Sequence, residues 1–113
     1  MKLAIAAVLL AFGCAKHETA QQRPIEPLPA GEVARAHDAC QSYVDKVCAC
    51  TAPAAQKQCA LAKPLPQALD LALQTAANPG EERDSQLRSQ VFVRETVKEC
   101  VEELAKLPAI GCR

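Results

Sequence analysis

The sequence has almost no aromatic side chains: its 113 residues include no tryptophan, one tyrosine and two phenylalanines. A core without large rings must be built from alanine, valine and leucine. A chain of this length has room for one small domain, and small domains bury a small share of their surface. The composition therefore predicts a marginal hydrophobic core that needs cross-links for stability.

Net charge is also missing, because 13 basic and 13 acidic residues cancel. The sequence contains neither a glycine-rich phosphate loop nor a basic, aromatic surface for nucleic acid. Serines are few, no nucleophile–base arrangement is visible, and no stretch alternates apolar and polar residues as a strand does. We therefore expect an all-α domain that is not an enzyme, carries no cofactor and does not bind nucleic acid.

Cysteine, in contrast, is abundant, with seven residues, and Cys14 stands apart from the other six. A short positive start is followed by an uncharged run over residues 3–12. That run has the length of a signal-peptide apolar region and is too short to span a membrane. Gly13, a small residue, directly precedes Cys14. The segment resembles a bacterial lipoprotein signal, in which a diacylglycerol is attached to the cysteine and cleavage occurs just before it.

The resemblance, which covers about the first fifteen residues, implies a signal peptide at 1–13 and lipidation of Cys14. Ala11 and Phe12 depart from the common pattern. The alternatives are an ordinary secretory signal or a short hydrophobic N-terminal helix, with Cys14 incidental in either case. In Gram-negative lipoproteins an aspartate after the cysteine commonly marks retention in the inner membrane, and Ala15 stands there instead. The resemblance therefore implies a lipid-anchored protein of the cell envelope, in the outer membrane and facing the periplasm.

The next segment, residues 14–30, is predicted to be a partly extended tether. It contains Pro24, Pro27 and Pro29, has few apolar residues and shows no periodicity. Proline restricts its own backbone and disfavours helix in the residue before it. We expect this segment to hold a domain formed by residues 31–113 away from the bilayer.

Three helical segments are predicted in that domain, over 32–50, 53–78 and 81–107. Pro64 and Pro66 interrupt the second one. The fold class predicted is therefore a small all-α, disulfide-stapled three-helix bundle with a broken middle helix. The apolar faces expected from spacings of three and four are Val33, Ala36, Cys40, Val44 and Val47, then Leu65, Leu69, Ala72 and Ala76, then Val93, Val97, Cys100, Val101, Leu104 and Leu107.

Two boundaries follow from turn-forming residues. Residues 78–81, with the sequence Asn-Pro-Gly-Glu, fit either a turn or an N-terminal cap of the third helix, and the sequence leaves both open. Pro108 and Gly111 are expected to end the third helix, which leaves Cys112 in the tail beyond it.

The six downstream cysteines are expected to form disulfides, because the exported compartment is oxidising. If 32–50 is one helix, Cys40 lies about 12 Å from Cys48 and about 15 Å from Cys50 along the axis. A disulfide needs Cα atoms within about 7 Å. Cys48 and Cys50 point about 200° apart on a helix, so they cannot pair either. Each of the three must then take a partner from Cys59, Cys100 and Cys112, which leaves six connectivities.

An up-down-up bundle narrows the choice further, because its first and third helices run parallel. Cys40 and Cys100 then lie at similar heights, Cys48 and Cys59 flank the first bend, and Cys112 lies near Cys50. We favour Cys40–Cys100, Cys48–Cys59 and Cys50–Cys112. Exchanging the partners of Cys48 and Cys50 is nearly as good.

The function expected is a structural or protein-binding module with a membrane lipid anchor and an envelope protein as its partner. The alternative is a small periplasmic metal factor, for copper or zinc, or a thiol-redox factor that uses Cys48, Cys50 and Cys59. His37 or Cys40 could supply a fourth ligand. No metal site is preferred, since the paired Cys-x-x-Cys motifs typical of zinc sites are absent.

One row of acidic residues can also be interpreted either as a functional site or as an ordinary solvated surface. Glu95, Glu99 and Glu103 recur at a spacing of four. Such a row can bind a cation or place carboxylates for acid–base chemistry, but a solvated helix face explains it more simply.

Overall fold

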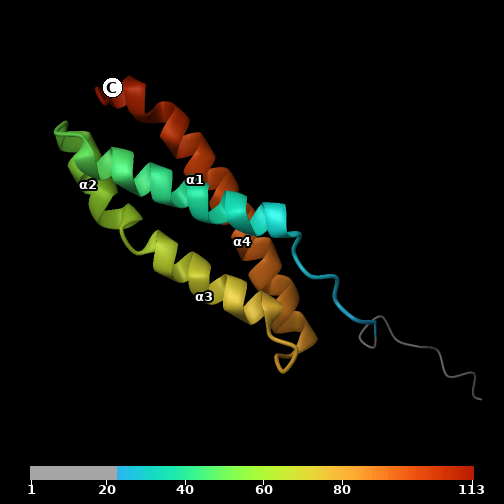
Figure 1. Ribbon diagram of the computed structural model, residues 1–113. Helices are drawn as coiled ribbons and strands as arrows, with labels where there is room; N and C mark the ends of the chain where they lie inside the picture. Colours follow the sequence, from blue (N-terminus) through green and yellow to red (C-terminus); the bar gives the residue numbers. More distant parts are fainter. Residues whose placement is uncertain (1–22) are drawn as a thin grey trace, which may run out of the picture.

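The computed structural model of the protein describes residues 23–113, which form helices and no strand. Signal peptide 1–13 and Cys14, as predicted from the sequence, lie outside these residues. The helices are α1 (Ala30–Ala49), α2 (Pro53–Ala62), α3 (Leu65–Ala77), α4 (Arg83–Lys106) and the short 3₁₀ helix η2 (Leu107–Ile110). α2 and α3 together form one bent rod (Figure 1), so the predicted bundle with a broken middle helix is confirmed.

The bend between α2 and α3 is caused by two prolines. Pro64 directly precedes α3, and Pro66 lies in the first turn of α3, where its missing N–H is not needed. Helical hydrogen bonds continue on both sides, from the Lys63 amide to the Cys59 carbonyl and from the Ala68 amide to the Pro64 carbonyl. The rod therefore changes direction without leaving many backbone groups unpaired.

A turn, not a helix cap, joins α3 to α4. Asn78 ends α3, and its side-chain oxygen accepts a hydrogen bond of 2.9 Å from the Gly80 amide. Its backbone carbonyl accepts a second one from the Glu81 amide. Glu82 is the residue that precedes α4. Of the two possibilities that the sequence left open, the structure has the turn.

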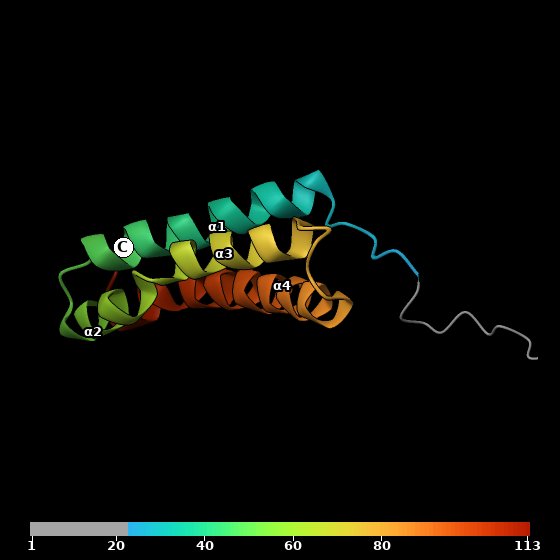
Figure 2. The ribbon, with the colours of Figure 1, turned by 90° about the horizontal axis from the view of Figure 1, so that it is seen from below.

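Helix α4 is the central element, since it packs against both α1 and α3. α1 and α4 run in the same direction, and α3 runs antiparallel to both (Figures 1 and 2). Four of the twelve residues in the core cluster are cysteines, and Tyr43 is the one aromatic residue among them. The cluster consists of Ala36, Cys40, Tyr43, Val47, Ala55, Cys59, Ala62, Leu69, Val93, Cys100, Leu107 and Cys112.

The buried face of α4 differs in part from the predicted one. Val93 and Cys100 are buried as expected, and so is Leu107, which the structure places in η2, but Val101 is 41% exposed. Gln90 and Thr96 are buried instead. A helix with a neighbour on each side buries a wider arc than one apolar stripe, so polar positions that flank the stripe are also covered.

The end of the predicted tether contacts the bundle. Residues 24–29 contain neither helix nor strand, as expected, but Ile25 and Leu28 are half-buried. The Gln90 side chain donates a hydrogen bond of 2.8 Å to the Glu26 carbonyl. The chain therefore approaches the bundle along α4 and enters it at the end where α1 and α4 begin (Figure 2).

Within residues 23–113, none of the helices combines the length and the apolar character that crossing a bilayer requires.

Candidate functional site

Three disulfides join the helices of the bundle. They are Cys40–Cys100, Cys48–Cys59 and Cys50–Cys112, with Cα–Cα distances of 5.0, 4.7 and 5.5 Å. These are the three pairs favoured from helix geometry. The near-equal alternative, in which Cys48 and Cys50 exchange partners, is not the one that the structure has.

The Cys40–Cys100 disulfide lies at the centre of the core. Both residues are fully buried, and they connect α1 to α4 across 60 positions of sequence. Cys40 lies near the middle of α1, and Cys100 lies in the later part of α4. This bond holds together the two longest helices of the described chain.

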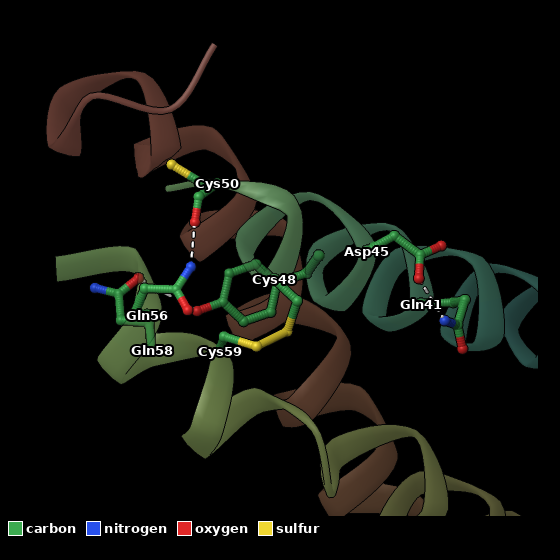
Figure 3. The surroundings of a disulfide bond; sticks show 8 residues. Gln41, Asp45, Cys48, Cys50, Gln56, Gln58 and Cys59 are labelled. Atoms are coloured by element: carbon green, nitrogen blue, oxygen red, sulfur yellow. Dashed lines mark hydrogen bonds between the residues drawn. A yellow bond between two sulfur atoms is a disulfide. The ribbon is translucent and has the colours of Figure 1, made fainter. Parts of the chain in front are cut away.

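The other two disulfides cross-link the end of the bundle that lies opposite the point where the chain enters it. Cys48–Cys59 closes the bend between α1 and α2, and the Gln56 side chain donates a hydrogen bond to the Cys50 carbonyl in the same bend (Figure 3). Cys50–Cys112 ties the carboxyl-terminal tail to this bend.

A left-handed glycine brings the tail back to the bundle. Gly111 has a φ of 92°, a backbone conformation that residues with a Cβ rarely adopt. Its turn allows the Cys112 amide to donate a hydrogen bond of 3.0 Å to the Leu107 carbonyl. The sequence predicted Gly111 as a helix stop, and the structure shows that it also aims Cys112 inward, where that residue is 6% exposed.

The pairing has a direct consequence for the metal or redox alternative. The sulfurs of Cys48, Cys50 and Cys59 are all bonded to other sulfurs, so none is a thiolate ligand in this oxidised form. His37 lies in an ion pair instead, with its Nδ1 3.1 Å from Asp70 Oδ1 on α3. Across residues 23–113 the structure groups no three metal-binding side chains.

The acidic row of α4 divides into two parts. Glu99 and Glu103 line a hollow of about 290 Å³ between α1, α2 and α4, whereas Glu95, one turn earlier, does not. Tyr43 of α1 and Leu61 of α2 line the same hollow. The sequence pattern did not reveal this division, because α2 covers only part of α4.

The electrostatics of the hollow act on Tyr43. Burial raises the pKa of its phenol above the ordinary value of 10.0, and the nearby carboxylates of Glu103 and Glu99 raise it further. The hydroxyl donates a long hydrogen bond of 3.5 Å to the side-chain oxygen of Gln58. Glu103 in turn accepts a hydrogen bond of 2.8 Å from Lys106 at the rim.

The single tyrosine makes this environment measurable, because there is no tryptophan absorbance to interfere. In the native protein we expect the phenolate absorbance of Tyr43 to titrate above pH 10.0, and after reduction and denaturation near 10.0. Glu103→Gln should lower the native midpoint, since it removes one negative charge, without restoring it fully. The raised pKa stabilises the fold below pH 10.0, and this contribution is lost as the pH rises through the native midpoint. A native midpoint at or below 10.0 would contradict the assignment.

A second hollow, of about 410 Å³, lies between α1 and α4. Val93, Val97 and Val101 form its apolar wall. Its rim carries charges of both signs, and the Arg94 Nε lies 3.1 Å from a carboxylate oxygen of Glu32. Arg35, Lys98 and Glu102 also line it, so basic side chains slightly outnumber acidic ones around this apolar surface.

Fold and disulfides define a cross-linked, all-α helical bundle. Comparison of the chain with models of protein families finds no match, and comparison with curated proteins and with solved structures finds none either.

Proposed function

We propose that the protein is a lipid-anchored lipoprotein of the cell envelope, whose helical domain is a non-catalytic structural or protein-binding module. The observation that carries the proposal is the complete pairing of the six cysteines downstream of Cys14. This pairing uses every other cysteine of the chain, so Cys14 is free for a separate role. The apolar run before Cys14 and the resemblance to a lipoprotein signal supply that role.

The disulfides also support an exported location. Disulfides persist in oxidising compartments and are rare in the cytosol. Two of these three join positions that are about sixty residues apart in sequence, so they act on the whole domain and not on a local loop. Ala15, in place of an aspartate, supports the outer membrane facing the periplasm as the destination.

The anchor is tested with the full chain expressed in a bacterium that has two membranes. Cells are labelled with a palmitate analogue, the membranes are separated, and the N-terminal peptide is identified by mass spectrometry. We expect the wild type to carry the label and to begin at a lipid-modified Cys14 in the outer-membrane fraction. Cys14→Ser should lose both the label and the cleavage before residue 14.

A matched control removes two other sulfurs. The Cys48→Ala/Cys59→Ala variant should keep the label, because those sulfurs belong to a disulfide. A wild-type protein that begins at residue 15 without lipid would show an ordinary secretory signal and refute the anchor.

The module itself is tested by titrating thiols in protein purified from the envelope. We expect no reactive thiol among the six downstream cysteines. Three or four thiols together with bound copper or zinc would overturn the non-catalytic proposal in favour of a metal factor.

A further inference from the structure

The hollow between α1, α2 and α4 combines an apolar wall with two carboxylates, of which one, Glu103, is paired with Lys106. Leu61 is 76% exposed at its edge, the highest exposure of any large apolar side chain among residues 23–113. Leu65 and the ring of Tyr43 continue the apolar lining. Exposed apolar surface that is rimmed by polar residues is typical of protein interaction sites.

The charge of the hollow has one sign. Glu99 and Glu103 are its ionisable side chains besides Tyr43, and within the described chain no lysine or arginine lines it. Lys106 lies at the rim, where its ammonium group forms an ion pair with Glu103. That ion pair does not include Glu99, the other carboxylate of the hollow. A positive group in the hollow would meet the carboxylates of Glu99 and Glu103.

We propose that this hollow is the docking surface for a basic, apolar segment of a partner protein. A lysine or arginine of the segment lies between Glu99 and Glu103, and an adjacent apolar side chain packs on Leu61 and Leu65. This inference rests on the protein-binding form of the proposed function.

The position of the hollow in the bundle fits this role. The chain enters at the end where α1 and α4 begin, whereas Tyr43, Glu99 and Glu103 lie in the later parts of those helices. α2, which carries Leu61, is at the far end from the entering chain (Figure 1). A domain anchored through its N-terminus therefore presents the hollow on the half farther from the anchor.

The larger α1–α4 hollow lacks such selectivity. Its lining includes Arg35, Arg94 and Lys98 as well as Glu32 and Glu102, and ion pairs join Glu32 to Arg94 and Lys98 to Glu102. Positive charge is in slight excess there, so this hollow does not favour a basic partner.

The test uses the full chain purified from the envelope in detergent and three short synthetic peptides of equal length. One contains lysine and leucine, one glutamate and leucine, and one lysine and serine. We expect saturable binding of the lysine–leucine peptide alone, measured by fluorescence anisotropy, with amide NMR shifts centred on Leu61, Glu99 and Glu103. Raised salt should weaken the binding, since the carboxylates are solvent-accessible.

Matched variants assign the binding to the hollow. Leu61→Ser and Glu99→Lys should each reduce affinity about tenfold, as expected for interface residues that carry binding energy. Leu71→Ser, at a leucine that is 66% exposed on α3, and Glu95→Lys, one turn before Glu99, should leave it unchanged. All variants are measured in the same detergent. Nonspecific partitioning of the peptide into detergent micelles is therefore the same for each and does not affect the comparison.

One substitution should strengthen binding. Lys106→Gln removes the cation that competes for Glu103, and affinity should rise about two- to threefold, in line with the strength of an exposed ion pair. If the peptide bound an exposed apolar patch nonspecifically, this substitution would not raise its affinity.

The inference is overturned by any of three results: no saturable binding, equal binding of the glutamate–leucine peptide, or NMR shifts centred on Val97 and Val101. These outcomes are distinct from failure of the anchor. Lipidation is read from the N-terminal peptide and does not depend on peptide binding, and a metal-loaded, reduced protein would be recognised by its thiols.

Discussion

The Cys40→Ala/Cys100→Ala variant is expected to lose about 4 kcal/mol of unfolding free energy, which is a large part of the stability of a small domain. The pair closes a loop of 60 positions and lies fully buried between α1 and α4. In the chain-entropy description, a long loop restrains the unfolded chain most. The core around it is made of small side chains, so little other burial compensates.

Thermal and denaturant unfolding followed by circular dichroism measure this loss. The melting temperature should fall by on the order of 20 °C. Cys48→Ala/Cys59→Ala is the control, since that pair closes only 11 positions. Its expected cost is about 3 kcal/mol, smaller by about 1 kcal/mol or more. Equal stability of the wild type and the Cys40→Ala/Cys100→Ala variant would show that packing alone holds the bundle.

Leu69→Ala should destabilise the domain by about 3 kcal/mol. Leu69, on α3, is 1% exposed and is the largest fully buried side chain of the described residues. Its truncation removes apolar burial and leaves a cavity between α3 and the helices that it packs against.

Leu71→Ala is the matched control on the same helix. Leu71 is 66% exposed, so its truncation should change the unfolding free energy by less than about 0.5 kcal/mol. The two variants are compared by urea unfolding of the oxidised protein. Similar midpoints for both would mean that α3 does not pack on the bundle as described.

Much of the helical framework could be predicted from particular residues. Prolines at 53, 64 and 66 mark where α2 and α3 begin, and residues spaced by three and four mark the buried faces. Helix rise alone reduced the disulfides to six connectivities, because it excludes pairing within one helix. The favoured set followed only when the helices were assumed to form an up-down-up bundle.

Other features depended on contacts between distant segments. The approach of residues 24–29 to α4 requires Gln90 to be placed beside the Glu26 carbonyl, 64 positions away in sequence. Proline-rich composition indicates extended backbone and does not indicate what that backbone contacts. For the same reason a buried Gln90 was not expected from its polarity.

The acidic row on α4 shows what sequence spacing can predict within the proposed site and what depends on tertiary packing. Spacing alone makes Glu95, Glu99 and Glu103 equivalent on one helix face. Only the packing of α2 against the later part of α1, closed by the Cys48–Cys59 disulfide, makes two of them neighbours of Tyr43 and Leu61.

By itself, the sequence determined the all-α class, the break in the middle helix and a short set of allowed cysteine pairs. These properties follow from period, proline placement and helix rise, which are local along the chain. The tertiary structure alone decided which face of α4 is covered, where the entering segment lies and where a negatively lined hollow forms. Those properties depend on how separate helices pack, and packing depends on all of the contacting surfaces at once.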